Sequence, residues 1–177
     1  VNVAVEIGKV ICVLDPAEAA ERDARLLAAM KDPSLAPPPP PPPALGPGNW
    51  VKSPGASMLS HQGRGSLNGK LGRFDEFVSR GWHLIGLDHV PGEDLSPDVK
   101  AGFDMLGGSR VKVSTVPTDD AIFDANGVYE AWFRELDADV VLVRPDHYVA
   151  FSVKRGGEGD MLAGLLATLK LNVPELV

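Results

Sequence analysis

The sequence predicts an α/β domain with a mixed sheet whose elements follow the order β-α-β-α-β-β-α. Short apolar runs of strand length, such as residues 140–143, recur in the second half of the chain. Segments with apolar residues at helical spacing alternate with several of these runs. Helix boundaries are also marked, for example by Ser96-Pro97 before one helix and Gly107-Gly108 after it.

The globular domain is expected over residues 56–177, and its first half is expected to form a β-α-β unit. Residues 56–80 contain several glycines and are typical of short strands and turns. The apolar run 82–87 predicts a buried strand, residues 97–106 predict a helix, and the alternating residues 111–116 predict a second strand. A right-handed crossover would make these two strands parallel.

The second half of the domain is expected to be an antiparallel hairpin followed by a helix. Residues 128–136 have apolar side chains at helical spacing, and the run 140–143 is typical of a central strand. Proline at the second position of Arg144-Pro145-Asp146-His147 predicts a tight turn, after which residues 148–153 return as a strand. A final helix is expected over 159–171. A parallel first half and an antiparallel second half make the thioredoxin-like arrangement.

Two further segments precede this domain. Residues 1–31 are expected to be a helical tail, because Asp15-Pro16 supplies an N-cap and a proline at the first helical position. Residues 32–55 are expected to be a linker, since the proline run 37–43 favours polyproline II. A spacer is the favoured interpretation of this run, and a ligand for an SH3-like or WW-like domain is the alternative. Because the chain begins at Val1 without a methionine, we expect it to continue a longer protein.

Composition argues against several classes of function. The chain has 177 residues, of which 44% are hydrophobic and 23% charged, and its formal net charge is -7. This acidic balance argues against nucleic acid as a partner, because phosphate binding depends on Lys and Arg. No apolar run approaches the roughly 18–20 residues that a membrane span needs. The one cysteine, Cys12, cannot form an internal disulfide and fits a cytoplasmic location, and we expect it to be buried.

The sequence contains no complete catalytic motif. A thioredoxin-like enzyme carries C-x-x-C at the start of its first helix, but the corresponding residues 88–95 include no cysteine, which excludes thiol–disulfide exchange. The glycine cluster 63–69 lacks the G-x-G-x-x-G spacing of a dinucleotide site and is expected to be a turn or hairpin. No G-x-S-x-G nucleophile elbow is present.

Three polar positions leave alternatives open. His89 and the acidic residues near it could gather around a cation, but a solvated acidic loop is favoured. His83 alternates with apolar neighbours and is expected to be a satisfied histidine of an edge strand. Arg144 and Asp146 could clamp a carboxylate or backbone of a partner, although stabilisation of their own turn is the simpler interpretation. No catalytic, cofactor-binding or metal-binding residue is assigned.

Four segments carry motifs that recur together in one family. They are the L-V-R-P-D turn within 139–149, D-x-x-G-x-Y-x-x-W over 124–132, Q-G-R at 62–64, and G-K-V-I-C, D-P and A-A-E-R-D-A within 8–24. These segments resemble FAD-dependent aromatic-ring hydroxylases such as phenol hydroxylase and 3-(3-hydroxyphenyl)propionate hydroxylase, although His61 stands where that family has a proline. The resemblance implies a structural role for the signature residues Asp124, Gly127, Tyr129, Trp132, Arg144, Pro145 and Asp146.

The resemblance implies that this chain is the non-catalytic C-terminal region, used for packing or dimerisation, of an aromatic monooxygenase. FAD and NAD(P)H would bind the parent enzyme outside this chain, so no cofactor is expected here. The expected partners are the parent's catalytic domain and a second copy in a homodimer, with neither nucleic acid nor membrane. The alternative is a free-standing, redox-inactive thioredoxin-like module for protein interactions.

Overall fold

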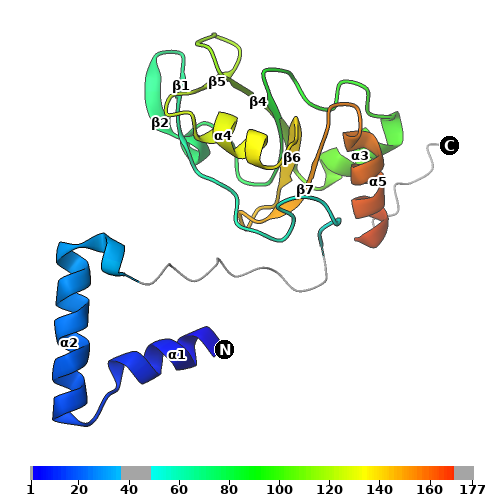
Figure 1. Cartoon of the computed structure of the whole chain (residues 1–177). Helices are drawn as coiled ribbons and strands as arrows, with labels where there is room; N and C mark the ends of the chain where they lie inside the picture. Colours follow the sequence, from blue (N-terminus) through cyan, green and yellow to red (C-terminus); the bar gives the residue numbers. More distant parts are fainter. Residues whose placement is uncertain (1, 37–48, 170–177) are drawn as a thin grey trace. The chain divides into compact units, whose positions relative to one another are not determined.

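The structure, a computed structural model, describes residues 2–36 and 49–169. The chain divides into two compact units, Val1–Pro41 and Pro42–Val177, which are both drawn in Figure 1. The predicted polyproline run 37–43 and the end of the last predicted helix lie outside the described residues.

The first unit contains two α-helices and a short 3-10 helix. These are α1 (Asn2–Ile11), α2 (Pro16–Lys31) and η1 (Pro33–Leu35). The predicted start of α2 is confirmed, because the Asp15 carboxylate accepts hydrogen bonds from the amides of Ala17 (2.9 Å) and Glu18 (3.0 Å). The sequence patterns do not predict α1, since its valines, isoleucines and Gly8 have low helix propensity.

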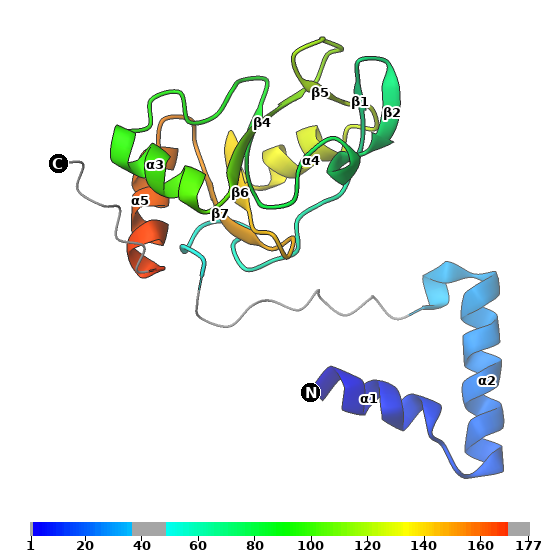
Figure 2. The same ribbon diagram turned by 180° about the vertical axis from the view of Figure 1, so that it is seen from behind.

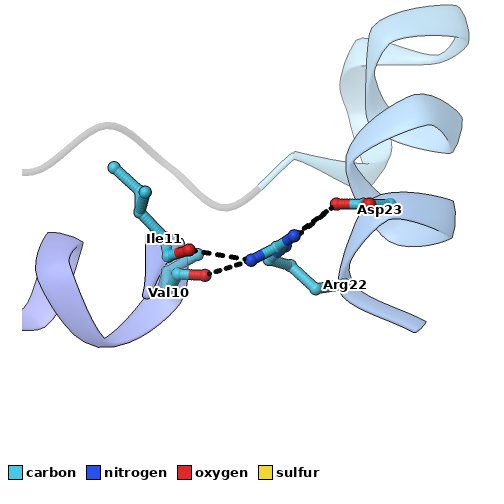
Figure 3. A network of polar contacts seen from close by, with 4 residues as sticks. All are labelled: Val10, Ile11, Arg22 and Asp23. Carbon is cyan, nitrogen blue, oxygen red and sulfur yellow. Dashed lines mark hydrogen bonds and ion pairs between the residues drawn. The ribbon is translucent and has the colours of Figure 1, made fainter. Parts of the chain in front are cut away.

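Arg22 connects the two α-helices of this unit (Figure 3). Its Nη1 donates hydrogen bonds to the carbonyl oxygens of Val10 (3.2 Å) and Ile11 (2.9 Å). These carbonyls end α1, where the last turn has no intrahelical donors and the helix dipole favours a cation. The Asp23 carboxylate accepts from Nε and Nη2 of the same guanidinium and holds it in place. Arg22 of α2 therefore caps the C-terminus of α1.

The described side chains of the first unit form no buried core. Leu27 and Met30, which the sequence places on an apolar face of α2, are 57% and 80% exposed. Cys12 is exposed as well, so the prediction of a buried cysteine is wrong. The physical reason is that the two helices meet through the polar cap of Arg22 and share no apolar layer that could enclose the thiol.

The second unit is built on one 7-stranded sheet with the strand order β2-β1-β5-β4-β3-β6-β7. Strands β3, β4 and β5 are parallel to one another, and all other neighbours are antiparallel. The strands are β1 (Arg64–Leu67), β2 (Lys70–Arg73), β3 (Trp82–Leu87), β4 (Gly108–Ser114), β5 (Ile122–Asp124), β6 (Val140–Val143) and β7 (Val149–Val153), with a 3-10 helix η2 (Phe74–Glu76) after β2.

Helices cover both faces of this sheet, as Figures 1 and 2 show from opposite sides. Helix α4 (Val128–Glu135) packs on one face, while α3 (Pro97–Met105) and α5 (Glu158–Thr168) pack together on the other. Strand residues alternate between the two cores: Ile85 lies in the α4 core and Leu84 in the α3 and α5 core. None of the helices within residues 2–36 and 49–169 combines the length and the hydropathy that a membrane-spanning helix requires.

The predicted fold class is confirmed, since β3-α3-β4-α4-β6-β7-α5 reproduces the order β-α-β-α-β-β-α. The predicted strands 82–87 and 140–143 agree with β3 and β6 residue for residue. Strand β5 was not predicted, because three residues flanked by polar turns give no clear period. It connects the β1–β2 hairpin to the central sheet, so the glycine-rich residues 63–69 extend the same sheet.

Residues 49–60 lie along the outer edge of the β6–β7 hairpin. The amide of Val51 donates to the carbonyl oxygen of Ala150 (2.8 Å), and the amide of Ser57 donates to the carbonyl oxygen of Val149 (2.9 Å). The amide of Val149 in turn donates to the carbonyl of Met58 (2.8 Å). This segment therefore pairs backbone groups that would otherwise leave an open strand edge.

Candidate functional site

The loop after β3, residues 88–95, occupies the place where a thioredoxin-like enzyme would carry its cysteines. Asp88 begins this loop with a left-handed backbone (φ 59°), a conformation that Asp tolerates better than most residues. Its carboxylate accepts hydrogen bonds from the backbone amide (2.8 Å) and the hydroxyl (2.9 Å) of Thr115. Asp88 therefore fastens the loop to the chain that follows β4.

Glu158, at the start of α5, holds the middle of the same loop. The side chain is buried, with 7% of the residue exposed, and its Oε1 accepts from the amide of Gly92 at 3.1 Å. Its Oε2 accepts from the amide of Gly156 at 2.7 Å, while Nη1 of Arg110 donates to the carbonyl of Gly92 at 3.3 Å. The loop is thus closed by hydrogen bonds to its backbone. Sequence reasoning missed Glu158, whose only local signal is an acid in the first turn of a helix.

The cation alternative for this loop has no ligand set. Within residues 2–36 and 49–169, no group of three or more His, Cys, Asp or Glu could hold a metal ion. Nδ1 of His89 lies 2.9 Å from the carbonyl oxygen of Leu87, to which it can only donate. Glu93 lies 3.8 Å from the guanidinium of Arg155. The acidic side chains of the loop, Asp88, Glu93 and Asp94, are exposed, whereas Pro91 and Gly92 are buried.

The signature residues Asp124 and Gly127 form the N-terminus of α4. Gly127 is the N-cap and has a left-handed backbone (φ 68°), which glycine adopts without strain. Because glycine has no side chain to cap the helix, Asp124 supplies the acceptors: its Oδ1 binds the amide of Val128 (3.1 Å) and its Oδ2 that of Glu130 (2.9 Å). Asp124 is 6% exposed, so both of its oxygens are used inside the protein.

Tyr129 and Trp132 lie three residues apart, on the face of α4 that packs against the sheet. The Tyr129 hydroxyl donates to the carbonyl oxygen of His61 (3.3 Å), and burial raises the pKa of this phenol above its usual value. The ring of Trp132 lies 5.2 Å from the ring of His61 between centroids. A Cβ at Gly63 would come within 2.9 Å of the Tyr129 ring, so glycine is required there. Two segments that carry the sequence signature therefore meet in one aromatic cluster.

The Arg144-Pro145-Asp146 signature forms the turn between β6 and β7. Nε and Nη2 of Arg144 donate to the two carboxylate oxygens of Asp146, at 3.1 and 2.7 Å. Its Nη1 reaches back to the carbonyl oxygen of Asn49 at 3.2 Å. The bidentate pair fixes the guanidinium plane, and the third bond fastens residues 49–60 to the turn. This geometry matches the simpler of the two interpretations that the sequence left open.

His83 does not lie in an edge strand, so that part of its prediction is wrong. Strand β3 is flanked by β4 and β6, and His83 pairs with Ser109 and Val143. The error arises because alternation with apolar neighbours also occurs in a central strand whose polar residue has a hydrogen-bond partner on the neighbouring strand. Nδ1 of His83 lies 2.8 Å from the Ser109 hydroxyl, and burial lowers the pKa of the imidazole.

Comparison with protein families places these residues in a known context. Residues 62–168, which are more than half of the chain and include all seven signature residues from Asp124 to Asp146, match the family model described as the HcaD C-terminal domain. The chain belongs to this family. The HcaD C-terminal domain of this protein thus begins at the Q-G-R segment and ends in α5, and it contains the Asp124 cap, the aromatic cluster and the Arg144 turn.

A curated relative extends the similarity beyond the HcaD C-terminal domain. The chain is 30% identical over 168 residues to the "Probable NADH-specific resorcinol 4-hydroxylase" of Rhodococcus jostii (strain RHA1). This alignment covers 94% of the present chain, and the chain spans 30% of the length of that relative.

Two solved structures have lower sequence identity to this chain and differ from each other in kind. One is the flavin-dependent monooxygenase PieE in complex with FAD and substrate, with 17% identity, a TM-score of 0.48, and coverage of 88% of this chain and 31% of PieE. The other is a thioredoxin-like protein from Bacteroides caccae, with 14% identity and a TM-score of 0.42. The match covers 88% of this chain and 57% of that protein.

Proposed function

We propose that this chain is the non-catalytic C-terminal region of a FAD-dependent, NAD(P)H-using aromatic monooxygenase acting on a phenolic substrate, similar to 3-(3-hydroxyphenyl)propionate hydroxylase. The observation that carries this proposal is the use of the signature side chains within the HcaD C-terminal domain. Asp124 caps α4, Tyr129 and Trp132 pack beneath it, and Arg144 holds its own turn. The hydrogen bonds and ring contacts of these residues within the domain support a structural role for them.

The relative supports the class of parent enzyme. That relative is described as a probable NADH-specific hydroxylase of resorcinol, a dihydroxybenzene. The present chain aligns with it along nearly the whole of its length, including the helical unit before the family match. FAD and NAD(P)H would be bound by the part of the parent that contains the dinucleotide fingerprint, which the present sequence does not contain.

The helical unit supports a structural attachment to further protein. Helix α2 buries no residue within the described unit. Leu26 (52% exposed), Leu27 and Met30 form an exposed apolar surface on this helix. An isolated helix of this length is marginal in water, so its stability must come from packing against another surface. We propose that the parent's catalytic domain supplies this surface in a cytoplasmic enzyme, and that the alternative is a free-standing redox-inactive interaction module.

The proposed division of labour predicts a colourless protein. The purified 177-residue chain should show no flavin absorbance, should not bind added FAD and should not oxidise NADH or NADPH with resorcinol. Isothermal titration with FAD and a spectrophotometric assay of NADH oxidation test this, with an intact flavin hydroxylase as the positive control. A yellow protein with stoichiometric flavin would contradict the proposal.

The exposed face of α2 predicts an effect of residues 1–31 on assembly. In the absence of the catalytic domain, the 177-residue chain should self-associate through this face, and a chain lacking residues 1–31 should be less associated. Light scattering measured over a range of concentrations gives the mass of each. Leu26→Glu in the full chain is a second test, because it places a charge on the same face of α2. It should lower the mass of the associated species as much as the removal of residues 1–31 does. If removal of residues 1–31 leaves a dimer intact, the dimer contact belongs to the thioredoxin-like domain.

A further inference from the structure

A cavity in the second unit is not used by any role assigned above. It has a volume of about 580 Å³ and lies at the end of the sheet where β3 begins and β6 ends. Its wall comes from the η2–β3 connection, from His83 at the start of β3, and from the β6–β7 turn. A cavity of this size can hold a small ligand. We call it the His83 pocket.

The charges that line the His83 pocket differ from those of the chain as a whole. The chain carries 24 acidic and 17 basic residues, yet Arg80, Arg144, His83 and His147 line the pocket with Asp75 as the one unpaired acid among its lining residues. Arg80 is exposed and has no ion-pair partner among residues 2–36 and 49–169. An unpaired guanidinium beside two imidazoles favours an anion with oxygen acceptors.

Arg144 can add donors to the same pocket. Its guanidinium has five N–H groups, and the bonds to Asp146 and Asn49 use three of them. Asp146 neutralises its charge, so Arg144 contributes hydrogen-bond donors in a fixed plane more than net charge. Arg80 then provides the charge that attracts an anion.

His83 makes the pocket selective, because it presents an acceptor as well. The hydroxyl of Ser109 lies 3.3 Å from the carbonyl oxygen of Trp82, to which it can only donate. Its single proton is used there, so the hydroxyl accepts from Nδ1–H of His83 at 2.8 Å. Nε2 of neutral His83 is then a lone-pair acceptor, and it has no hydrogen-bond partner among the described residues. Burial and the nearby His147 lower the pKa of His83 and keep this nitrogen unprotonated.

This combination of donors and acceptors identifies the class of ligand. Arg80 favours a negatively charged oxygen and Arg144 adds neutralised hydrogen-bond donors, while Nε2 of His83 and the Asp75 carboxylate require a proton on the ligand. Monohydrogen phosphate and the monoanion of a phosphate monoester carry both, whereas sulfate at neutral pH has no proton to donate. We propose that the His83 pocket binds a protonated phosphate group, with Arg80 as the charge partner and Nε2 of His83 as the acceptor of its O–H.

Calorimetric titration of the 177-residue chain with inorganic phosphate, phenyl phosphate and sulfate tests this proposal at about pH 6, where roughly half of a phosphate monoester is the monoanion. At least one of the two phosphates should bind saturably, and sulfate should bind about tenfold more weakly, because sulfate leaves the Nε2 acceptor of His83 unpaired. Stronger binding of phenyl phosphate would identify a monoester as the ligand, and stronger binding of inorganic phosphate would identify the free ion. No saturable binding of either phosphate, or equal binding of phosphate and sulfate, would overturn the proposal.

Two variants separate the roles of the pocket residues. Arg80→Gln should weaken binding of the preferred phosphate about tenfold or more. His83→Asn retains an amide donor near the position of Nδ1 but removes Nε2, so it should abolish the preference for phosphate over sulfate. Arg155→Gln, an exposed arginine that does not line the pocket, is the matched control and should bind as the wild type does. Thermal unfolding shows whether each variant is folded.

A readout independent of the variants is the NMR resonance of Nε2 of His83, followed during a phosphate titration of the wild type. An unchanged Nε2 resonance at saturation would overturn the assignment of His83.

Discussion

Replacement of Trp132 by alanine should destabilise the HcaD C-terminal domain by about 3–5 kcal/mol, as buried aromatic truncations do. Trp132 is 4% exposed. The centroid of its ring lies 5.2 Å from that of His61, 6.1 Å from that of Tyr129 and 5.7 Å from that of Phe133. Removal of the indole would leave a cavity beneath α4 and withdraw the contact that holds residues 61–63 against this helix. A loss of this size approaches the whole stability of a typical domain.

Urea unfolding followed by circular dichroism measures the effect of Trp132→Ala. Trp132→Phe retains a ring and most of the apolar surface, so it should lose less stability than the alanine variant. Leu71→Ala is the exposed control, because Leu71 is 53% exposed on the edge strand β2 and should change stability by no more than about 0.5 kcal/mol. A Trp132→Ala domain as stable as the Leu71→Ala domain would show that the aromatic cluster does not support the fold.

Replacement of Asp124 by alanine should lower the free energy of unfolding of the domain by about 2–3 kcal/mol. The carboxylate satisfies two amides at the start of α4, those of Val128 and Glu130, and Gly127 has no side chain that could take its place. The expected loss exceeds that of an ordinary N-cap because Asp124 is buried and a negative charge is favourable at a helix N-terminus.

The matched control for this cap is Asp119→Ala, which removes an exposed carboxylate between β4 and β5. Asp124→Asn should lie between the wild type and Asp124→Ala, because the amide retains one oxygen acceptor but loses the charge and the second oxygen. Hydrogen exchange adds a local measurement: the amides of Val128 and Glu130 should lose protection in Asp124→Ala before those of β3. Unchanged protection at these two amides would contradict the assignment of Asp124 as the cap.

Neither result requires the parent enzyme, so both test the structural role of the signature directly. If Asp124 and Trp132 act only through the fold, phosphate binding at the His83 pocket should be lost from their variants only when the domain itself unfolds. The three groups of experiments therefore report on separate features: the aromatic cluster and the α4 cap, the pocket at the opposite end of β3 from loop 88–95, and the cofactor content of the chain.

The sequence by itself determined the local features of this protein. Strand β6 is a continuous apolar run and β3 is apolar except for His83 and Gly86. Helices α2 and α3 begin at Asp15-Pro16 and Ser96-Pro97, and the predicted caps are observed. The lack of cysteine in loop 88–95 and of a dinucleotide fingerprint also follows from the sequence alone. Such signals are readable because they depend on residues that are close neighbours in the chain.

Only the tertiary structure decided which distant groups meet. Arg144 binds the carbonyl of Asn49 across 95 positions, and Glu158 binds the amide of Gly92 across 66. Alternation predicts which residues share a face with His83 but not how many strands flank its own strand, which lies between β4 and β6. Strand order, the closure of the loop after β3 and the convergence of charges at the His83 pocket all depend on packing between elements, for which short-range patterns contain no signal.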